Sequence, residues 1–290
     1  MKLTTGVTIE PLKERFGFGD KYFFIGSCFA DSIGCLMQES GFDVTVNPFG
    51  VVYNPVSVAQ SLERLAGREP FAGSDVICTE GRYTSFYHHS RFNRDTPEEF
   101  LRDANDALKQ AADAFEAATV CVVTLGTNRV FRHKERDMIV SNCHKVLASE
   151  FERENLSVDE CTDVLARIVA RYPGKKWIFT VSPIRYMAFG AHASQLGKAT
   201  LLLAVDALQQ RFGNVRYFPA YEIMMDELRD YRFYEENLTH PSHQAVEYIF
   251  DGFRQFAIDS ACEQRIAAAR KAARAARHRA FQFGNPASNQ

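Results

Sequence analysis

Short apolar runs recur along the chain, and each is interrupted by Gly, Pro or Asn before it reaches the length of a helix. The runs are rich in β-branched and aromatic residues, which is typical of strands. Longer amphipathic intervals separate them. We therefore expect five strands, at residues 21–26, 43–46, 120–126, 176–181 and 215–218.

Two of the intervals begin with clear helix-start signals. Thr96 precedes Pro97 and is followed three residues later by Glu99, and Ser157 stands in the same relation to Glu160. These are capping boxes. Strands that alternate with helices predict an α/β protein with a doubly wound five-stranded parallel sheet, for which we expect the strand order 2-1-3-4-5. Ligands of such sheets bind beyond the carboxyl ends of the strands, so the chemistry should lie just after each strand.

Two segments do not fit a simple alternation of strands and helices. Residues 54–118 are longer than a single crossover, and they contain the stretch "YTSFYHHSRF" at 83–92. We interpret them as a helical and aromatic insertion after the second strand, either a cap over the site or a surface subdomain. Residues 259–290 form an Ala- and Arg-rich helix and tail, which we expect to be solvated, with docking on an anionic surface as the alternative. Residues 1–258 then form the main domain.

Composition and charge narrow the class of protein. The 290 residues are 46% hydrophobic, which suits one globular domain, and a formal net charge of −2 argues against a general nucleic-acid binder. Seven cysteines without C-x-x-C spacing favour reduced thiols over a disulfide framework or a zinc site. No apolar run has the length of a signal peptide core or a membrane span, so we expect a soluble cytoplasmic protein.

The turn after the first strand carries the clearest candidate for chemistry. Gly26, Ser27 and Cys28 lead from the strand into an amphipathic helix. At a helix N-terminus the unpaired N–H groups and the helix dipole stabilise an anion, so a thiolate at Cys28 should have a lowered pKa. The alternative is a small buried cysteine in a tight turn.

Further candidates follow the other strands. The N–H of Gly50 and the amide of Asn128 could donate to an oxyanion, although a turn and a helix cap are their ordinary roles. Near the C-terminus, His240 could serve as a general base oriented by Asn237, with His243 as a nearby competitor. Nucleophile, donors and base at one edge of one sheet together indicate acyl-transfer chemistry.

Seven ordered motifs carry a resemblance to a known family. The sequence from about residue 20 to 255 closely resembles the GSCFA family, which is similar to the SGNH (GDSL-like) esterases and acyltransferases. The resemblance implies an SGNH-hydrolase-like three-layer α/β/α fold. The motifs are "GSCFA" (26–30), "NPFGVVYNP" (47–55), "LGTN" (125–128), "SNCHK" (141–145), "TVSPIR" (180–185), "YFPAYEIMMDELRDYRFY" (217–234) and "HP" (240–241).

The first SGNH block, Gly-Asp-Ser, ends in the nucleophile. Laid over it, "GSC" puts Cys28 at the nucleophile position and Ser27 at the Asp position, with Ser27 as the alternative nucleophile. The glycine of the second block and the Asn of the third match Gly50 and Asn128, which implies that both belong to the oxyanion hole.

The last SGNH block, Asp-x-x-His, matches Asn237 and His240. Asn237 thus replaces the carboxylate that orients the histidine. A Cys–His pair depends less on that carboxylate than a Ser–His pair does, so the two departures from the pattern are consistent with each other. With Ser27 as nucleophile, Glu235 or Glu236 would have to take the place of the carboxylate.

Other motif residues are candidates for substrate binding. His144 and Lys145 of "SNCHK" could contact an anionic substrate, or they could be core and capping residues beside Cys143. We expect no metal site here, because adjacent Cys and His side chains rarely reach one ion. The remaining candidates for substrate contact are Arg185, Tyr87 and His88.

The resemblance implies an SGNH-like esterase or O-acyltransferase that acts on a carbohydrate or another hydroxylated substrate. No cofactor is expected, and acyl-CoA stays open as an acyl donor. A catalytically silent module that binds a glycan or lipid in the same pocket is the alternative. The expected partners are a small molecule or a glycan, without nucleic acid or an integral membrane segment.

Overall fold

A computed structural model describes the backbone of residues 5–283 and the side chains of residues 5–277. Its central sheet has five parallel strands in the order β2-β1-β5-β9-β10, which confirms the predicted order 2-1-3-4-5. Each expected strand lies within one residue of its predicted bounds. The strands are β1 (Lys21–Gly26), β2 (Asp43–Val46), β5 (Val120–Leu125), β9 (Lys176–Val181) and β10 (Val215–Tyr217).

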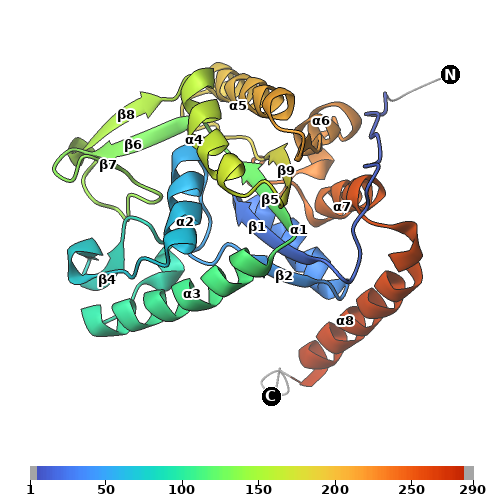
Figure 1. Cartoon of the computed structure of the whole chain (residues 1–290), viewed down its shortest axis with the longest axis horizontal. Helices are drawn as coiled ribbons and strands as arrows, with labels where there is room; N and C mark the ends of the chain where they lie inside the picture. The colour runs from blue at the N-terminus through green and yellow to red at the C-terminus, as the bar shows by residue number, and fades with distance from the viewer. Residues whose placement is uncertain (1–4, 284–290) are drawn as a thin grey trace, which may run out of the picture.

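Helices cover both faces of this sheet, so the fold is a three-layer α/β/α arrangement (Figure 1). One face packs against α2 (Pro55–Gly67), α3 (Pro97–Ala117), α4 (Val158–Arg171) and α5 (Ala191–Arg211). The other packs against α1 (Cys28–Glu39), α7 (His243–Ala257) and the start of α8 (Glu263–Phe283). Along β1, Phe23 and Phe24 are fully buried on opposite faces, as a two-sided strand requires.

Both helices begin where the signals predicted, but only one of the two capping boxes forms in full. Ser157 and Glu160 form a reciprocal capping box at the start of α4, whereas Thr96 caps α3 by accepting the N–H of Glu99 without a bond in return from the Glu99 side chain.

Smaller elements surround the main sheet. Two strands, β3 (Val76–Thr79) and β4 (Arg82–Ser85), form a hairpin, and three more, β6 (Arg129–His133), β7 (Met138–Ile139) and β8 (Phe151–Asn155), form an antiparallel sheet that the sequence did not predict. Short helical turns are α6 (Ala220–Glu222), η1 (Gly73–Asp75), η2 (Ser90–Phe92), η3 (Ala148–Glu150), η4 (Ile223–Glu227), η5 (Tyr231–Phe233) and η6 (Ser260–Cys262).

Most of segment 54–118 belongs to the helical layer over the sheet rather than to a separate cap. Val58 and Leu62 of α2 and Phe100 and Phe115 of α3 are at most 1% exposed and belong to the core on that face. The two helices are therefore the crossover from β2 to β5, lengthened by the β3–β4 hairpin.

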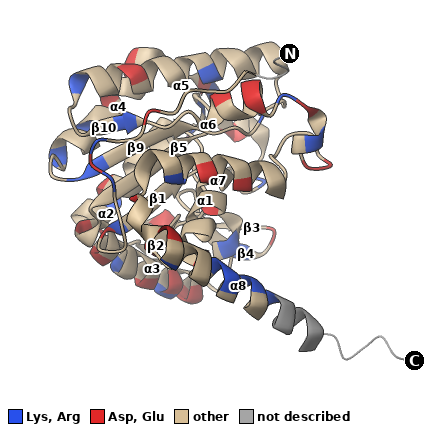
Figure 2. Ribbon diagram, turned by 90° about the vertical axis from the view of Figure 1, so that its right-hand side faces the viewer, with Lys and Arg blue, Asp and Glu red and all other residues tan. Residues whose placement is uncertain are grey.

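The basic helix α8 contacts the main domain between Ile266 and Arg277. Ile266 is buried, Arg270 forms an ion pair with Glu247, and Arg277 reaches Glu39 of α1. Figure 2 shows the Lys and Arg residues that mark this helix. Part of its positive charge is thus neutralised within the protein. The end of the tail expected at 259–290, residues 284–290, lies outside the described residues.

Candidate active site

The turn that presents Cys28 is set by a glycine with no room for a side chain. Gly26 has a φ of +142°, and a Cβ there would lie 2.1 Å from the carbonyl oxygen of Thr124 on β5. Ser27 is the N-cap of α1, and Cys28 is the first residue of the helix. The N–H of Cys28 is therefore one of those that the helix itself leaves unbonded.

Asn47, the first residue of "NPFG", holds this turn from the neighbouring strand. It is fully buried and has a φ of +38°. Its Oδ1 accepts the N–H of Gly26 at 2.7 Å, and its Nδ2 donates to Asp31 in the first turn of α1 at 2.6 Å. We did not predict this role, although the position of Asn47 directly after β2 is a signal for it.

A cavity of about 480 Å³ opens beside Cys28, and we call it the main cavity. It lies at the carboxyl ends of β1, β5 and β9, as expected for a doubly wound sheet. Both Cys28 and His240 line it, so the structure brings these two candidates together. The main cavity is lined by Ser27, Cys28, Tyr53, Asn54, His89, Gly126, Thr127, Arg129, Phe131, Val140, Ser141, Asn142, Cys143, Ser182, Ile184, Tyr186, Thr239 and His240.

The thiol of Cys28 is half-buried and lies 3.8 Å from the Tyr53 hydroxyl. Burial raises the pKa of Cys28 above its ordinary value, and the charge of Asp31 adds to the rise; the Tyr53 hydroxyl and the N–H of Cys28 itself oppose it. The predicted lowering of this pKa by the helix N-terminus is therefore wrong. Desolvation is the largest influence on this pKa, so the resting group is a thiol that needs a base.

Ser27, the alternative nucleophile, has its hydroxyl engaged. Only 1% of the residue is exposed, and its Oγ donates to Ser182 Oγ at 3.0 Å and accepts the N–H of Phe29 at 3.3 Å. A hydroxyl that makes two hydrogen bonds at a buried N-cap has a structural role. This arrangement favours Cys28 over Ser27 as the nucleophile.

His240 lies in an exposed turn whose geometry Asn237 sets. The N–H groups of Thr239 and His240 both donate to Asn237 Oδ1, at 2.8 and 2.9 Å. Two backbone donors identify that atom as the oxygen, so the Asn237 Nδ2 faces His240 Nδ1, at 3.1 Å. A neutral imidazole then accepts at Nδ1 and carries its proton on Nε2. Asn237 does contact the ring as predicted, but it presents a donor where a carboxylate would present an acceptor.

The two expected oxyanion donors are engaged elsewhere. The N–H of Gly50 donates to Asn47 O at 2.8 Å, and the Asn128 amide donates to Leu156 O at 2.8 Å. Neither residue lines the main cavity. Their positions do not support the expected role, because a donor within a turn or between loops is not directed at a reacting atom. The donors that do lie beside the sulfur are the N–H of Cys28 and the hydroxyl of Tyr53.

Two histidines expected at the substrate are core residues instead. His88 is fully buried among aromatic rings, with Nδ1 on Ser85 Oγ at 2.7 Å, and burial with the nearby His144 lowers its pKa to about 3. His144 Nε2 donates to the carbonyls of Ser85 and His88, at 2.9 and 2.8 Å. Of the neighbouring pair "HH", it is His89 that lines the main cavity.

The other candidates for substrate contact also lie away from the main cavity. Lys145 is exposed and paired with Glu80, and Tyr87 packs against Phe71 in the core. Arg185 lines a separate hollow of about 420 Å³, where its guanidinium lies near the Tyr231 ring. In a single sequence, a tyrosine, lysine or arginine looks the same whether it lies in the core, on the surface or at a binding site. The pattern could therefore not distinguish these three roles.

A buried lysine beneath the site was not predicted. Lys198 of α5 is 2% exposed, and its Nζ donates to Gly126 O at 2.7 Å and Ser182 O at 2.8 Å. Both acceptors follow strands and line the main cavity. Burial lowers the pKa of Lys198 to about 7. Its place in the Leu-rich helix of 191–211 gave no sign of this contact.

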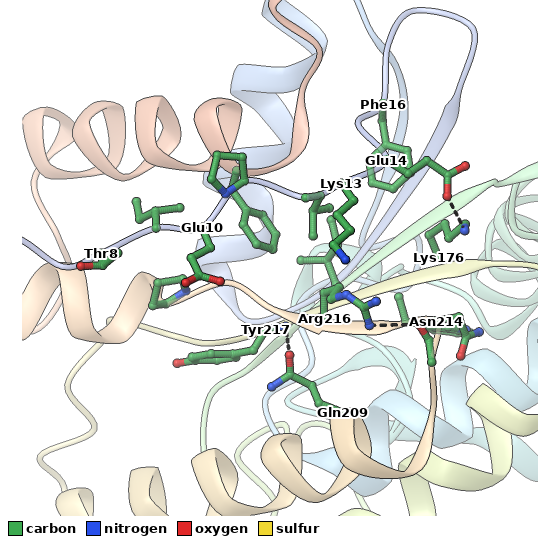
Figure 3. A pocket seen from close by; sticks show the side chains of 18 residues that line it. Thr8, Glu10, Lys13, Glu14, Phe16, Lys176, Gln209, Asn214, Arg216 and Tyr217 are labelled. Carbon is green, nitrogen blue, oxygen red and sulfur yellow. Dashed lines mark hydrogen bonds and ion pairs between the residues drawn. The ribbon is translucent and has the colours of Figure 1, made fainter.

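A larger hollow, of about 620 Å³, lies elsewhere on the molecule (Figure 3). It is bounded by the N-terminal segment, by the start of β9 and by the edge strand β10, where Lys176 pairs with Glu14 and Gln209 accepts the N–H of Tyr217. None of the predicted site residues lines it. It runs along β10 as far as Pro219 and shares no lining residue with the main cavity.

Among the described residues, no group of three His, Cys, Asp or Glu side chains is arranged to hold a metal ion. None of the helices described is long and apolar enough to cross a lipid bilayer.

The doubly wound sheet, with its candidate nucleophile at the turn after the first strand, is a three-layer α/β/α fold around five parallel strands. Residues 21–253 match the model of the GSCFA family, and the chain belongs to this family. A similar solved structure is that of a carbohydrate esterase family 2 enzyme with a carbohydrate binding domain from Corynascus thermopiles (Myceliophthora fergusii). The identity is 14%, the TM-score is 0.40, and the match covers 91% of this chain and 68% of that one. A comparison with curated proteins gives no match.

Proposed function

We propose that the protein is an esterase or O-acyltransferase whose nucleophile is Cys28. The observation that carries the proposal is the convergence of Cys28 and His240 on one cavity at the carboxyl edge of the sheet, with Cys28 at the first position of α1. In the proposed reaction, Cys28 Sγ bonds to the carbonyl carbon of an ester, and the bond to the leaving oxygen breaks. The Cys28 N–H and the Tyr53 hydroxyl stabilise the oxyanion between these events.

The walls of the main cavity suit an acyl group. Phe131, Val140 and Ile184 offer apolar contact, and Arg129 is the one formally charged residue among the lining residues described. His240 exchanges protons with the thiol and the leaving oxygen. We propose a carbohydrate or another hydroxylated compound as the alcohol part of the substrate, and no cofactor.

A specific observation favours the second candidate function, a catalytically silent module that binds a glycan or lipid in the main cavity. Nδ1 of His240 faces an amide donor, which leaves the ring proton on Nε2, and the pKa of Cys28 is raised. Both features weaken proton transfer from thiol to imidazole.

Acylation of Cys28 separates the two functions. The protein is mixed with p-nitrophenyl acetate, the burst of p-nitrophenolate is followed, and the acetylated residue is identified by peptide mass spectrometry. We expect a burst and a label on Cys28, both lost in Cys28→Ala and both kept in Cys78→Ala. Cys78 is an exposed cysteine on β3 and serves as the matched control. A slow reaction without a burst, spread over several cysteines, would support the binding module.

A further inference from the structure

A second hollow, of about 300 Å³, also opens at Cys28. It is walled by helices instead of strand ends: Ser32, Cys35 and Glu39 come from α1, His243 and Val246 from α7, and Arg277 from α8. Among the residues whose side chains are described, it shares Cys28, Ile184 and His240 with the main cavity and no others. Cys28 and His240 therefore line both hollows.

The two spaces differ in chemistry. The lining of the main cavity contains no carboxylate among the described residues, whereas Glu39 and Glu235 line the second hollow. Arg277 binds Glu39 through both of its terminal nitrogens, with contacts of 2.8 and 3.2 Å. Carboxylate acceptors beside guanidinium donors are the groups that recognise vicinal hydroxyls, each of which both donates and accepts.

We propose that the second hollow is the acyl-acceptor site and that the protein transfers an acyl group to a hydroxyl of a small polyol or sugar bound there. This inference rests on the proposed function and assigns transfer over hydrolysis. The acyl donor occupies the main cavity, and the acceptor reaches the same sulfur from the helical side.

The chemistry balances in two steps. First, the Cys28 thiol attacks the donor ester, a thioester C–S bond forms, the C–O bond of the donor breaks, and the thiol proton leaves with the donor alcohol. Second, the acceptor hydroxyl attacks the thioester, a new C–O bond forms, the C–S bond breaks, and the hydroxyl proton returns to the sulfur. No oxidant, reductant or further reactant is required.

The arrangement also gives the basic helix a function. Arg277 lies in the last described turn of side chains on α8, more than two hundred residues after Glu39, yet the two meet at the wall of this hollow. The helix thus completes the acceptor site from outside the matched family region, which ends at residue 253.

The test measures how the acetylated protein divides its acyl group between water and an added acceptor. The full chain is given p-nitrophenyl acetate with increasing methyl α-D-glucoside or glycerol, and acetylated product and acetate are quantified. We expect the rate of transfer from the acetylated protein to saturate with acceptor concentration, and the ratio of transfer to hydrolysis is compared between variants at one acceptor concentration. In Cys35→Trp the indole fills the hollow from an exposed helix position, so the ratio should fall about tenfold, which corresponds to about 1.4 kcal/mol. Arg277→Ala should raise the acceptor concentration needed for half-maximal transfer.

The matched control is Cys78→Trp, which adds the same side chain at an exposed cysteine that lines neither space; its ratio should equal that of the parent. Failure of the proposed function and failure of this inference give different results. Without acetylation of Cys28, the proposed function itself is wrong. Normal acetylation with a transfer rate that rises linearly with acceptor, or with a ratio of transfer to hydrolysis that Cys35→Trp leaves unchanged, overturns the acceptor site alone. Transfer to a primary amine but not to either polyol overturns the assignment of a hydroxyl acceptor.

Discussion

The two sides of the candidate site are built differently. On the Cys28 side, a glycine without room for a side chain, a buried N-cap and the buried Asn47 fix the turn through bonds to neighbouring strands. On the His240 side, an exposed turn is held mainly by its own residue Asn237. The position of the nucleophile thus depends on the core of the fold. The tautomer of the imidazole depends on one exposed amide, that of Asn237, so the two sides should respond differently to substitution.

The largest effect is expected at Gly26. In Gly26→Ala the new Cβ would lie 2.1 Å from Thr124 O and 2.8 Å from two further backbone atoms of the same residue, at a φ of +142°. Both strands are central, so neither can move away cheaply. We expect a loss of about 4 kcal/mol or more in the free energy of unfolding, or no folding at all.

Urea denaturation followed by circular dichroism measures this loss. Gly174→Ala is the control, because a Cβ at Gly174 meets nothing within 4 Å; it should change the free energy of unfolding by less than about 0.5 kcal/mol. If the two variants were equally stable, the Cys28 side would not depend on the core as we argue.

A pH-dependent effect of intermediate size is expected from Lys198, which also lies on the Cys28 side. Burial lowers its folded pKa to about 7 from an ordinary value of 10.5. Below pH 7 the lysine is charged in both states and the folded state bears the full desolvation cost. Between pH 7 and 10.5 the unfolded state binds more protons, so the free energy of unfolding rises with pH. The rise is at most about 1.4 kcal/mol per pH unit.

Lys198→Met should remove this contribution. The free energies of unfolding of the variant and the parent are measured by urea denaturation at pH 7, 8 and 9. The parent should become increasingly more stable than the variant as the pH increases. The methionine also leaves the carbonyls of Gly126 and Ser182 without their lysine donor, which lowers stability by a pH-independent amount. A difference that stays constant from pH 7 to 9 would contradict a lowered pKa.

The same contrast explains what the sequence could and could not predict. Apolar runs and capping boxes predicted the five strands, their order and the starts of α3 and α4, because burial and helix capping act locally. They also predicted the turn of Cys28. They could not predict that His88 packs in the core while His89 lines the main cavity. Two adjacent histidines give the same signal in the sequence and differ only in the direction in which their side chains point.

The pKa of Cys28 needed the structure for a different reason. The helix N-terminus can be inferred from sequence, but the burial that raises the pKa of the thiol depends on how the whole chain packs. The partner of the Asn128 amide, Leu156, and the carbonyls that accept from Lys198 are distant in sequence. Long-range contacts of this kind leave no periodic pattern. Family motifs mark the positions of such residues in the sequence, but they do not show which other residues these contact.

The smallest expected effect concerns the His240 side and is a gain. In Asn237→Asp one carboxylate oxygen keeps the N–H groups of Thr239 and His240, and the other replaces the Nδ2 that faces His240 Nδ1. The ring then donates from Nδ1 and accepts at Nε2, as a base for the Cys28 thiol must. We expect the acylation burst with p-nitrophenyl acetate to become about tenfold faster, the factor given by about 1.4 kcal/mol. Asn237→Ala, which removes the side chain from the turn, should be slower than the parent. An equal rate in Asn237→Asp and the parent would mean that His240 is not the base in the rate-limiting step.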